Sequence, residues 1–577
     1  MFLLNIKKRK EEKEMKNFVS ATLLCDFYKV SHKNLYPKGT ELIYSTFTPR
    51  SNKYFPTASN VVVAGIQGFV KKYLINYFNE HFFNRDKETV VSEYERVIKY
   101  SLGVDKPDSA HIAELHDLGY LPIKLTALKE GTLVPIKTPV LTIENTNPKF
   151  FWLTNYLETL ISTEIWQMMT SATIAKEYRK LLDKYAMQTV GNKDAVGFQG
   201  HDFSMRGMSS LETAMLSGAG HLLFFTGTDT IPAILYLEEF YNANMEKELI
   251  AGSIPATEHS IMSAGTPYGE DLNEYDTFKR IITEVHPSGL VSIVSDTYDF
   301  WKVVTETLPQ LKNEIMTRDG KLVVRPDSGD PVEIICGKNL PEFDSVADAF
   351  DNYELEFSHD AKLMLEDKDE DEYSYKEDYE VRVGNRVITL HFKAYKTEYE
   401  IDEYFDYSAR PIKAEDKGLI ECLWDTFGGT VTEQCYKLLD SHIGAIYGDS
   451  ITIERAEEIC KRLEQKEFAS VNVVFGIGSY TYQHNTRDTL GFAMKATFAE
   501  INGEKKLLFK DPKTDDGTKR SQKGRVRVYK EDNKIKYEDG LLEVVGDNML
   551  ETVFENGKLL REQSLSEIRK IAQKGVL

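Results

Sequence analysis

The sequence predicts an α/β protein, in which an irregular parallel β/α half-barrel-like domain is combined with an α+β domain built from the N- and C-terminal parts of the chain. Three observations lead to this fold class. Short apolar runs end in Gly, Ser or Asp clusters, pairs of these runs recur about 30 residues apart, and patterns typical of antiparallel strands follow towards the C-terminus. Continuous apolar runs are typical of buried parallel strands, and a β-α repeat takes about 30 residues. An acidic insertion interrupts the half-barrel.

Four apolar runs are the expected parallel strands, at residues 291–296, 322–329, 443–449 and 471–478. Each run ends in small or acidic residues. Because parallel α/β sheets and barrels bind their ligands at the carboxyl ends of strands, the polar residues at these ends outline a candidate site. The long interval between the second and third runs indicates that a segment has been inserted there.

The insertion is predicted at residues 345–415. Within it, residues 351–410 contain 18 acidic and 8 basic side chains, a net charge of -10 out of -20 for the whole chain. Such a composition is typical of a solvated surface segment. Gly384-Asn385 separates two strand-like runs and predicts a β-hairpin.

Two capping-box patterns predict helices outside the insertion. Ser209 and Glu212 precede one apolar stretch, and Ser564 and Glu567 precede another that closes at Gly575. In a capping box, the serine accepts from a backbone N–H of the first turn, while the acid returns to the serine's own backbone N–H.

The C-terminal part is predicted to be a separate α+β element. Residues 525–528 and 552–554 have the pattern of antiparallel strands, and Asn556-Gly557 is a hairpin turn signal. The expected domains are a disordered leader at 1–17, an α+β domain from 18–160 together with 490–577, and a β/α barrel-like catalytic domain at 161–489 that holds the insertion.

Composition excludes several classes of protein. No stretch approaches the roughly 20 apolar residues that a membrane helix needs, and the charged run near the N-terminus is unlike a secretory signal. Five scattered cysteines without a C-x-x-C pair fit reduced thiols in a cytoplasmic protein. A net charge of -20 argues against binding to nucleic acid or anionic membranes, and it leaves small anionic substrates open.

Acids and glycines gather at the predicted strand ends. Arg325 and Asp327 put a phosphate-binding cation beside an acid that can take ribose hydroxyls or a metal-bound water, although an ion pair closing a turn is the alternative. Gly448-Asp449 and Gly478 allow backbone N–H groups to approach a phosphate, although tight turns have the same sequence. Together with Asp296, these residues have the side chains and backbone groups that could bind a phosphosugar with its magnesium ion.

A basic cluster follows the last predicted strand. Arg487, Lys495, Lys510 and residues 519–525 concentrate cations in an acidic chain. The ordinary interpretation is a solvated face, but cations next to glycine-rich strand ends favour an anion-binding role.

Eight ordered motifs resemble the nicotinamide phosphoribosyltransferases, a family of type II phosphoribosyltransferases. They are DFYKVSH at 26–32, HDFSMRG at 201–207, GTDT at 227–230, PATEHS at 255–260, SDTYD at 295–299, RPDSG at 325–329, GD at 448–449 and KDP at 510–512. The resemblance runs from about residue 20 to the C-terminus, except for the insertion. It implies a pentosyltransferase that joins nicotinamide to phosphoribosyl pyrophosphate in NAD biosynthesis, with Mg²⁺, ATP as an optional co-substrate, and a homodimer with shared active sites.

The resemblance also implies a pyridine pocket. Phe203 and the partner chain's copy of Tyr28 would stack on the ring, and core packing is the usual alternative for such aromatics. Asp229 would accept the carboxamide N–H and repel the carboxylate of nicotinic acid, although it could simply cap a turn. Arg206 and Ser292 resemble neighbouring pocket residues.

The family's phosphoribose contacts match strand-end residues here. Asp327 and Gly448-Asp449 would hold the ribose, Arg325 would face the phosphates, and Gly478 would belong to the 5′-phosphate loop. Asp296, with Asp327, would lie near Mg²⁺, directly or through water. Pyrophosphate would be held by cations that the family takes from the partner subunit, here Arg50, Arg487, Lys495 and Lys519.

His259 matches the histidine that family members phosphorylate with ATP, although a histidine beside Glu258 is more often a hydrogen-bonded structural residue. Two positions depart from the family, Ser479 in place of a phosphate-loop glycine and Ala493 in place of a serine. Two hypotheses compete with this function. The chain could be a nicotinate-specific relative, or an inactive homologue that acts through its acidic insertion.

Overall fold

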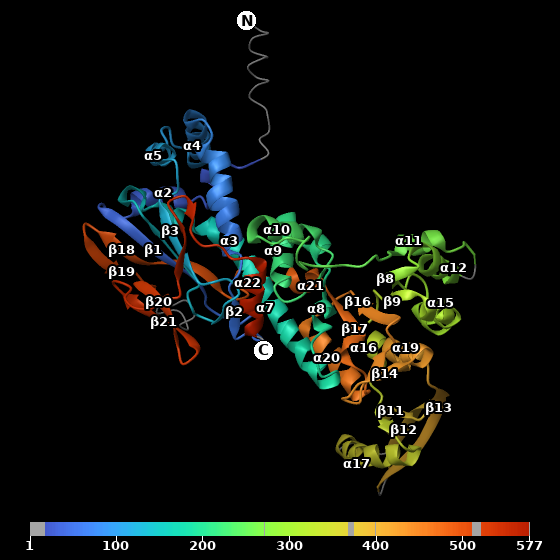
Figure 1. Cartoon of the computed structure of the whole chain (residues 1–577). Helices are drawn as coiled ribbons and strands as arrows, with labels where there is room; N and C mark the ends of the chain where they lie inside the picture. Colours follow the sequence, from blue (N-terminus) through green and yellow to red (C-terminus); the bar gives the residue numbers. More distant parts are fainter. Residues whose placement is uncertain (1–17, 270–271, 367–373, 398–399, 511–520, 576–577) are drawn as a thin grey trace. The chain divides into compact units, whose positions relative to one another are not determined.

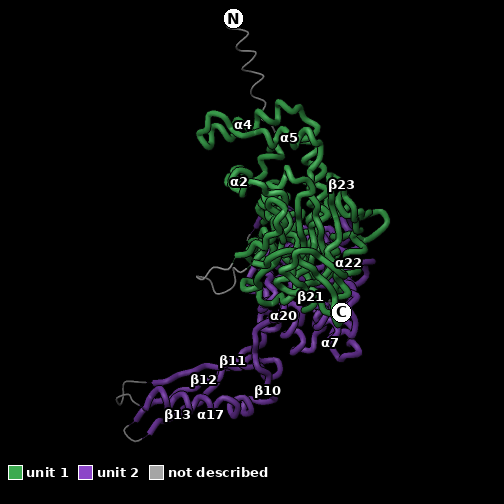
Figure 2. The backbone as a smooth tube through the Cα atoms, turned by 90° about the vertical axis from the view of Figure 1, so that its left-hand side faces the viewer, with its two compact units in different colours: residues 1–181, 196–253, 477–577 green, residues 182–195, 254–476 purple. Residues whose placement is uncertain are grey.

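The computed structural model describes residues 18–269, 272–366, 374–397, 400–510 and 521–575 (Figure 1). The chain forms two compact units: unit 1 contains residues 1–181, 196–253 and 477–577, and unit 2 contains residues 182–195 and 254–476 (Figure 2). The leader at 1–17, which is predicted to be disordered, lies outside the described residues. The predicted site residue Lys519 does so as well.

Unit 1 is built on a seven-stranded antiparallel sheet, and this arrangement brings the N- and C-terminal parts of the chain together as predicted. Thr46 lies opposite Lys495, so the first and the eighteenth strands are direct neighbours. The strand order is β19 (Glu504–Leu507), β18 (Phe492–Ile501), β1 (Thr40–Pro49), β5 (Leu141–Asn145), β3 (Ile123–Ala127), β22 (Glu551–Glu555) and β23 (Lys558–Leu559).

Smaller elements complete unit 1. A short parallel pair, β6 (Gly200–Asp202) and β7 (Gly227–Thr228), overlaps the two motifs for which a pyridine pocket is predicted. The predicted strand at 525–528 is part of β20 (Arg525–Glu531), which pairs antiparallel with β21 (Lys534–Leu541). The main helices are α2 (Lys29–Leu35), α4 (Lys87–Leu102), α5 (Ala110–Leu118), α7 (Glu158–Thr189), α9 (Leu211–His221), α10 (Ile231–Tyr241) and α22 (Leu565–Lys574). The last part of α7, from residue 182, belongs to unit 2.

One of the two predicted capping boxes is confirmed and the other is wrong. Ser564 and Glu567 cap α22 reciprocally. In α9 the cap is Ser210 with Thr213, one residue later than predicted. The carboxylate of Glu212 is engaged elsewhere, because it accepts hydrogen bonds from Lys72 and from the Tyr73 hydroxyl.

Unit 2 contains the four predicted strands, which are parallel neighbours in the order β17, β16, β9, β8. Their apolar centres face one another, with Leu322 opposite both Val291 and Ile443. This sheet and the antiparallel sheet of unit 1 confirm the predicted fold class. The bounds are β8 (Ser288–Val294), β9 (Asp319–Arg325), β16 (Ile443–Tyr447) and β17 (Val473–Ile477), with helices α11 (His259–Gly265), α12 (Tyr275–Arg280), α15 (Lys312–Thr317), α16 (Pro331–Cys336), α19 (Leu419–Phe427) and α20 (Ile453–Gln465).

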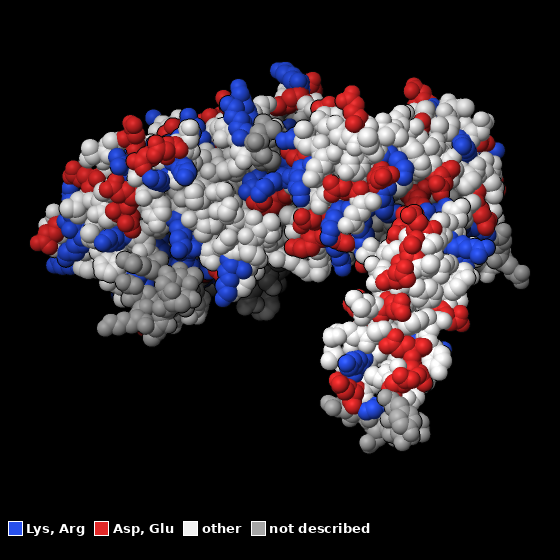
Figure 3. Space-filling view, turned by 90° about the horizontal axis from the view of Figure 1, so that it is seen from below, with Lys and Arg blue, Asp and Glu red and all other residues white. Residues whose placement is uncertain are grey.

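The insertion forms a helix and a four-stranded sheet with a hydrophobic core of their own. Phe357 of the helix and Leu390 and Phe392 of the sheet are fully buried in this core. The predicted hairpin at Gly384-Asn385 is confirmed, because Val383 pairs with Arg386. Figure 3 shows acidic side chains along the insertion. The elements are α17 (Val346–Leu365), β10 (Glu342–Phe343), β11 (Ser374–Val383), β12 (Arg386–Lys396) and β13 (Ile401–Pro411).

Candidate active site

The strand ends of unit 2 bring predicted site residues together. Asp296 follows β8, whereas Arg325 is the last residue of β9 and Asp327 follows it. Asp296 Oδ2 accepts hydrogen bonds from the Asp327 backbone N (2.9 Å) and from Ser328 Oγ (2.6 Å). Gly448 and the exposed Asp449 follow the neighbouring strand β16. Acids and glycines therefore follow the carboxyl ends of adjacent parallel strands, where α/β proteins bind ligands.

Asp296 is suited to holding a cation or a hydroxyl. Its other oxygen, Oδ1, is buried without a hydrogen-bond partner in the described residues. A buried carboxylate oxygen without a partner is costly, so this atom is a candidate contact for a cation or a hydroxyl. No cluster of three or more His, Cys, Asp or Glu side chains able to hold a metal occurs in the described part of the chain. Asp296 and Asp327 nevertheless fit Mg²⁺, which is usually bound by one or two carboxylates, waters and substrate phosphates.

Among the described residues, Arg325 forms no ion pair, so the turn-closing ion pair considered as its alternative role is not seen there. Its Nη2 donates to the Thr257 carbonyl at 2.8 Å, and its Nε is buried without a partner among the described residues. Ser292, on β8, is also buried with an unpartnered hydroxyl in the described structure. Polar atoms left unpaired inside a protein are candidates for ligand contacts.

His259 lies at the start of α11, and the strand β8 fixes the segment before it. Thr257 and Ser292 are joined by a backbone hydrogen bond of 3.0 Å. The His259 side chain is exposed, and its Nδ1 lies 3.1 Å from Thr297 Oγ1. Glu274, which is only 2% exposed, lies near Thr297.

Glu274 was not predicted from the sequence. Burial, and then the negative charge of Asp296, raise the pKa of Glu274 to about 7, while the nearby Thr297 side chain opposes the rise. No local pattern marks this acid, because its proximity to Thr297 and Asp296 depends on tertiary packing. A buried acid with a strongly shifted pKa is a candidate functional residue.

Three predicted pyridine residues of unit 1, Phe203, Arg206 and Asp229, lie in the turns that follow β6 and β7. The Asp229 backbone N donates to the Asp202 carbonyl at 2.9 Å. Asp229 Oδ1 lies 2.9 Å from His201 Nε2 and accepts from Ser253 Oγ at 2.5 Å. Phe203 is half-buried, with its ring 4.8 Å from that of His201. Asp229 therefore belongs to a polar cluster with His201 and Ser253. His201 was not predicted as a site residue, although it lies in the motif at 201–207.

The loop around Gly478 accommodates the first departure from the family. Gly478 precedes the short helix α21 (Ser479–Tyr482), and the space where its Cβ would lie is open. A Cβ added at Gly207 would lie 2.0 Å from Ser479 Oγ, so the serine fits because residue 207 has no side chain. Arg206, beside this glycine, is exposed.

The predicted cations Arg50, Arg487 and Lys495 lie near one another in unit 1. Burial lowers the pKa of Lys495, the charge of Glu158 raises it, and the charges of Arg50, Lys29 and Arg487 lower it further. Lys495 Nζ lies 3.9 Å from Glu158 Oε1, and Lys29 forms a close ion pair with the same carboxylate. Cations concentrated in this way favour the binding of an anion.

Two further predicted positions adjoin these cations. Tyr28 is 56% exposed, and Lys29 Nζ lies 4.8 Å from the centroid of its ring. This exposure argues against the core-packing alternative for Tyr28. Ala493, the second departure from the family, is buried on β18 opposite Thr48.

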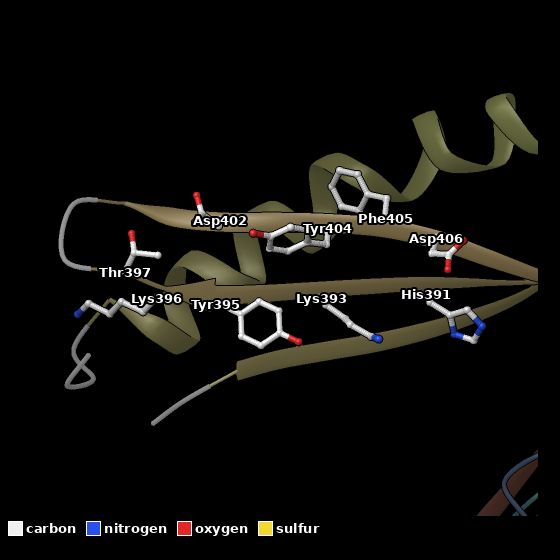
Figure 4. Close-up of a pocket in the computed structure, with 9 residues that line it drawn as sticks. All are labelled: His391, Lys393, Tyr395, Lys396, Thr397, Asp402, Tyr404, Phe405 and Asp406. Atoms are coloured by element: carbon white, nitrogen blue, oxygen red, sulfur yellow. The ribbon is translucent and has the colours of Figure 1, made fainter. Parts of the chain in front are cut away.

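The structure also contains a cavity away from these residues. It has a volume of about 710 Å³ and lies on the sheet of the insertion, lined by side chains that include Lys393, Tyr395 and Tyr404 (Figure 4). Its lining has both signs of charge, since Asp402 and Asp406 face it as well. None of the predicted site residues lines this cavity.

Comparison with known proteins identifies similar chains. The profile of the nicotinate phosphoribosyltransferase (NAPRTase) family matches residues 198–365 and 392–558, and that of the nicotinamide phosphoribosyltransferase N-terminal domain matches residues 20–125. The chain is 44% identical to the nicotinamide phosphoribosyltransferase of Acinetobacter baylyi over 94% of this chain and 95% of the relative. It is 32% identical to the protein of that name from Mycoplasma pneumoniae, over 89% and 98%.

A solved structure also aligns over most of the chain. It is the crystal structure of nicotinate-nucleotide pyrophosphorylase from Pyrococcus furiosus, with 14% identity, a TM-score of 0.49, and coverage of 97% of this chain and 98% of that one. Separately, no helix in the described part of the chain is long and apolar enough to span a membrane.

Proposed function

The chain belongs to the nicotinate phosphoribosyltransferase family, and on this premise we propose that it is a nicotinamide phosphoribosyltransferase. It would form nicotinamide mononucleotide and pyrophosphate from nicotinamide and phosphoribosyl pyrophosphate, a step of NAD biosynthesis. The names of its relatives and the acid at Asp229 support nicotinamide as the substrate. Five free thiols support a cytoplasmic location.

Asp229 carries the choice of substrate. Its carboxylate can accept a hydrogen bond from the carboxamide of nicotinamide, whereas the carboxylate of nicotinate would meet a like charge. Phe203 offers a ring face for stacking, which adds affinity for either pyridine without selecting between them. Arg206 and Ser292 complete the proposed pyridine contacts.

The charges suit the bond that must break. As pyrophosphate leaves, positive charge grows on the ribose and negative charge on the leaving group. Asp327 and Asp449 would hold the ribose hydroxyls, while Arg325 and the backbone at Gly448 and Gly478 would face the phosphates. Bound Mg²⁺, held through Asp296 and Asp327, would neutralise phosphate charge. Arg50, Arg487, Lys495 and Lys519 would bind the departing pyrophosphate.

We also propose a homodimer with shared active sites. Tyr28 presents an exposed ring beside the cations of unit 1, as a surface that serves a neighbouring subunit would. A chain carrying Asp327→Ala and a chain carrying Lys495→Ala test this. Coexpression should restore about a quarter of wild-type activity if the two residues serve different subunits' sites, because half of randomly mixed dimers then have one intact site of two. Complementation should be absent if each site uses one chain.

ATP would stimulate the reaction by phosphorylating His259. The exposed imidazole at the start of α11 supports this role, because a phosphoacceptor must be reached by the nucleotide. His259→Ala should abolish ATP-dependent stimulation and leave some synthesis without ATP. Full retention of the stimulation would show that His259 is not the phosphoacceptor.

One assay tests the substrate and the coupling together. Purified protein with Mg²⁺ and phosphoribosyl pyrophosphate is given nicotinamide or nicotinate, with and without ATP, and mononucleotide formation is measured. We expect turnover of nicotinamide, faster with ATP. A preference for nicotinate would contradict the substrate, and no release of pyrophosphate from either pyridine would support an inactive, binding homologue instead.

A further inference from the structure

His221 is a fully buried histidine that the proposed chemistry does not use. It is the last residue of α9 in unit 1, and both of its ring nitrogens have a hydrogen-bond partner. Nδ1 lies 2.7 Å from the Tyr482 hydroxyl, and Nε2 lies 3.0 Å from the Gly227 carbonyl oxygen. A buried polar group whose hydrogen bonds are all made rigidifies the segments that it joins.

The two partners fix which nitrogen of His221 carries the proton. Burial lowers the pKa of His221, so the ring is neutral and has a single N–H. A carbonyl oxygen can only accept, so Nε2 donates to Gly227 and Nδ1 accepts from the Tyr482 hydroxyl. The ring also stacks on Phe225, with 4.9 Å between the ring centroids. An apolar ring could stack there equally well, but it would make neither hydrogen bond.

The first partner of His221 belongs to the segment that carries Asp229. Gly227 and Thr228 form the strand β7, and Asp229 follows directly. The Thr228 backbone N donates to the Gly252 carbonyl at 3.1 Å, which ties the strand on one side. The bond from His221 to Gly227 therefore holds the backbone two residues before the proposed acceptor of the carboxamide.

The second partner of His221 closes the loop that is proposed to bind the 5′-phosphate. Tyr482 is fully buried and is the last residue of α21. Its backbone N donates to the Gly478 carbonyl at 3.2 Å, so the position of Tyr482 and the position of Gly478 depend on each other. The Tyr482 hydroxyl is therefore the point at which His221 holds this loop.

From these contacts we infer that His221 is a positioning residue, whose ring holds the segment before Asp229 and the loop after Gly478 in one fixed arrangement. The pyridine and the phosphoribosyl group must meet in a single geometry for the new bond to form, and such orientation lowers the barrier of a reaction between two substrates. Because its ring is buried and both nitrogens are engaged, His221 acts through the two segments and not on a substrate. The inference rests on the proposed function and extends it to a residue outside both binding motifs.

The two hydrogen bonds of His221 can be removed one at a time. His221→Asn places an amide oxygen near the position of Nδ1, so it still accepts from Tyr482 but loses the donor to Gly227. We expect the KM for nicotinamide to rise about fivefold, as the loss of one neutral hydrogen bond predicts, with the KM for phosphoribosyl pyrophosphate within about twofold of wild type.

His221→Gln should have the opposite pattern. It places an amide nitrogen near the position of Nε2, so it keeps the donor to Gly227 and loses the acceptor for Tyr482. The KM for phosphoribosyl pyrophosphate should then rise about fivefold, while the KM for nicotinamide stays within about twofold of wild type. Tyr482→Phe removes the same bond from its other end and should reproduce this result. The double variant should add less than about twofold, because both changes remove one bond.

Ser217→Ala is the matched control. Ser217 is buried on α9, one turn before His221, and its hydroxyl accepts a hydrogen bond from Ser171 Oγ at 3.2 Å. The substitution thus removes a buried hydrogen bond of the same helix that involves neither Gly227 nor Tyr482. It should lower thermal stability and leave both KM values unchanged.

The outcomes separate the inference from the function on which it rests. If the Asn and Gln variants of His221 raise both KM values alike, or Ser217→Ala raises either as much, the effect is structural and the inference is overturned. If no variant changes either KM while wild type is active, the positioning role is wrong and the proposed function stands. If the His221 variants do not fold, Tyr482→Phe decides by the same measurement. If wild type forms no mononucleotide from nicotinamide, the proposed function is wrong and the inference falls with it.

Discussion

The two groups of candidate site residues are held by the fold in opposite ways. In unit 2, acids follow the ends of parallel strands, and Asp296 has one buried oxygen without a partner in the described structure. In unit 1, cations lie around the carboxylate of Glu158, which is close to both Lys29 on α2 and Lys495 on β18. The acids are thus left ready for a positive or hydrogen-bonding ligand, whereas the cations depend on an internal counterion to stay together. Substitutions should therefore act directly on the ligand in unit 2 and through electrostatics in unit 1.

The largest effect is expected at the strand ends of unit 2. Asp327→Ala should lower kcat/KM for phosphoribosyl pyrophosphate about 10²- to 10³-fold, because a group that stabilises transition-state charge is lost. Steady-state kinetics at saturating nicotinamide measures this. The neighbouring Asp330→Ala is the control: Asp330 caps α16 by accepting from Val332 N and Glu333 N, so it should cost about 1 kcal/mol of stability and no activity. Equal activity losses in both variants would contradict the assignment.

A smaller effect is expected in the pyridine pocket. Asp229→Ala should reduce the preference for nicotinamide over nicotinate about 10- to 100-fold, since a repulsive element against the carboxylate disappears. The ratio of kcat/KM for the two pyridines gives the result. Ser253→Ala removes one donor to the same carboxylate and should change this ratio less than about fivefold. An unchanged ratio in Asp229→Ala would refute recognition of the amide by this residue.

The cations of unit 1 should make the KM for phosphoribosyl pyrophosphate depend on pH. Since burial and neighbouring cations lower the pKa of Lys495 from its usual 10.5, its ammonium loses the proton earlier as pH rises, and pyrophosphate binding weakens with it. The KM for phosphoribosyl pyrophosphate should therefore increase on the alkaline side, below the ordinary lysine range. Glu158→Gln removes the charge that raises the pKa of Lys495 and should move this increase to lower pH. Lys495→Arg should remove it, and an identical profile in all three proteins would contradict the electrostatic account.

The smallest effect lies outside both groups. Ser564→Ala removes the confirmed cap of α22 and should lower the free energy of unfolding by about 1 kcal/mol, with unchanged turnover. Chemical denaturation measures the change. Ser566→Ala, two residues further on, is a serine-to-alanine control that leaves the cap intact and removes instead the hydrogen bond from Ser566 Oγ to Glu248. A loss of activity in Ser564→Ala would show that this helix end is coupled to the site.

The sequence predicted the unit 2 strand ends well because their signal is local. An apolar run followed by Asp296, or by Arg325 and Asp327, indicates a buried strand and its polar end without knowledge of any other segment. The parallel neighbours then follow from the β-α repeat. The pairing of Thr46 with Lys495 had no such signal, because it joins the two ends of the chain.

The predictions that were wrong or absent also concern contacts between residues that are distant in the sequence. Ser209 and Glu212 fit the capping pattern, but Lys72 and Tyr73, distant in sequence, bind the glutamate and leave the cap to Ser210 and Thr213. Likewise, nothing around Glu274 or His201 in the sequence shows which residues pack against them. Tertiary contacts decide such cases, and the family resemblance supplied the roles of Phe203, Asp229 and His259 that local chemistry could not.

Because the insertion has a hydrophobic core of its own, we expect that another folded domain can replace it. Its sheet begins at β10 and ends at β13, the two outer strands, and both meet the hairpin near its turn, where Arg382 N donates to the Pro341 carbonyl and Arg386 pairs with Pro411. Three strand spacings separate the incoming and outgoing chain, about 14 Å, which a linker of about five residues can span. We therefore expect that a reporter domain with adjacent termini can replace residues 342–411 while the parallel strands on either side keep their register.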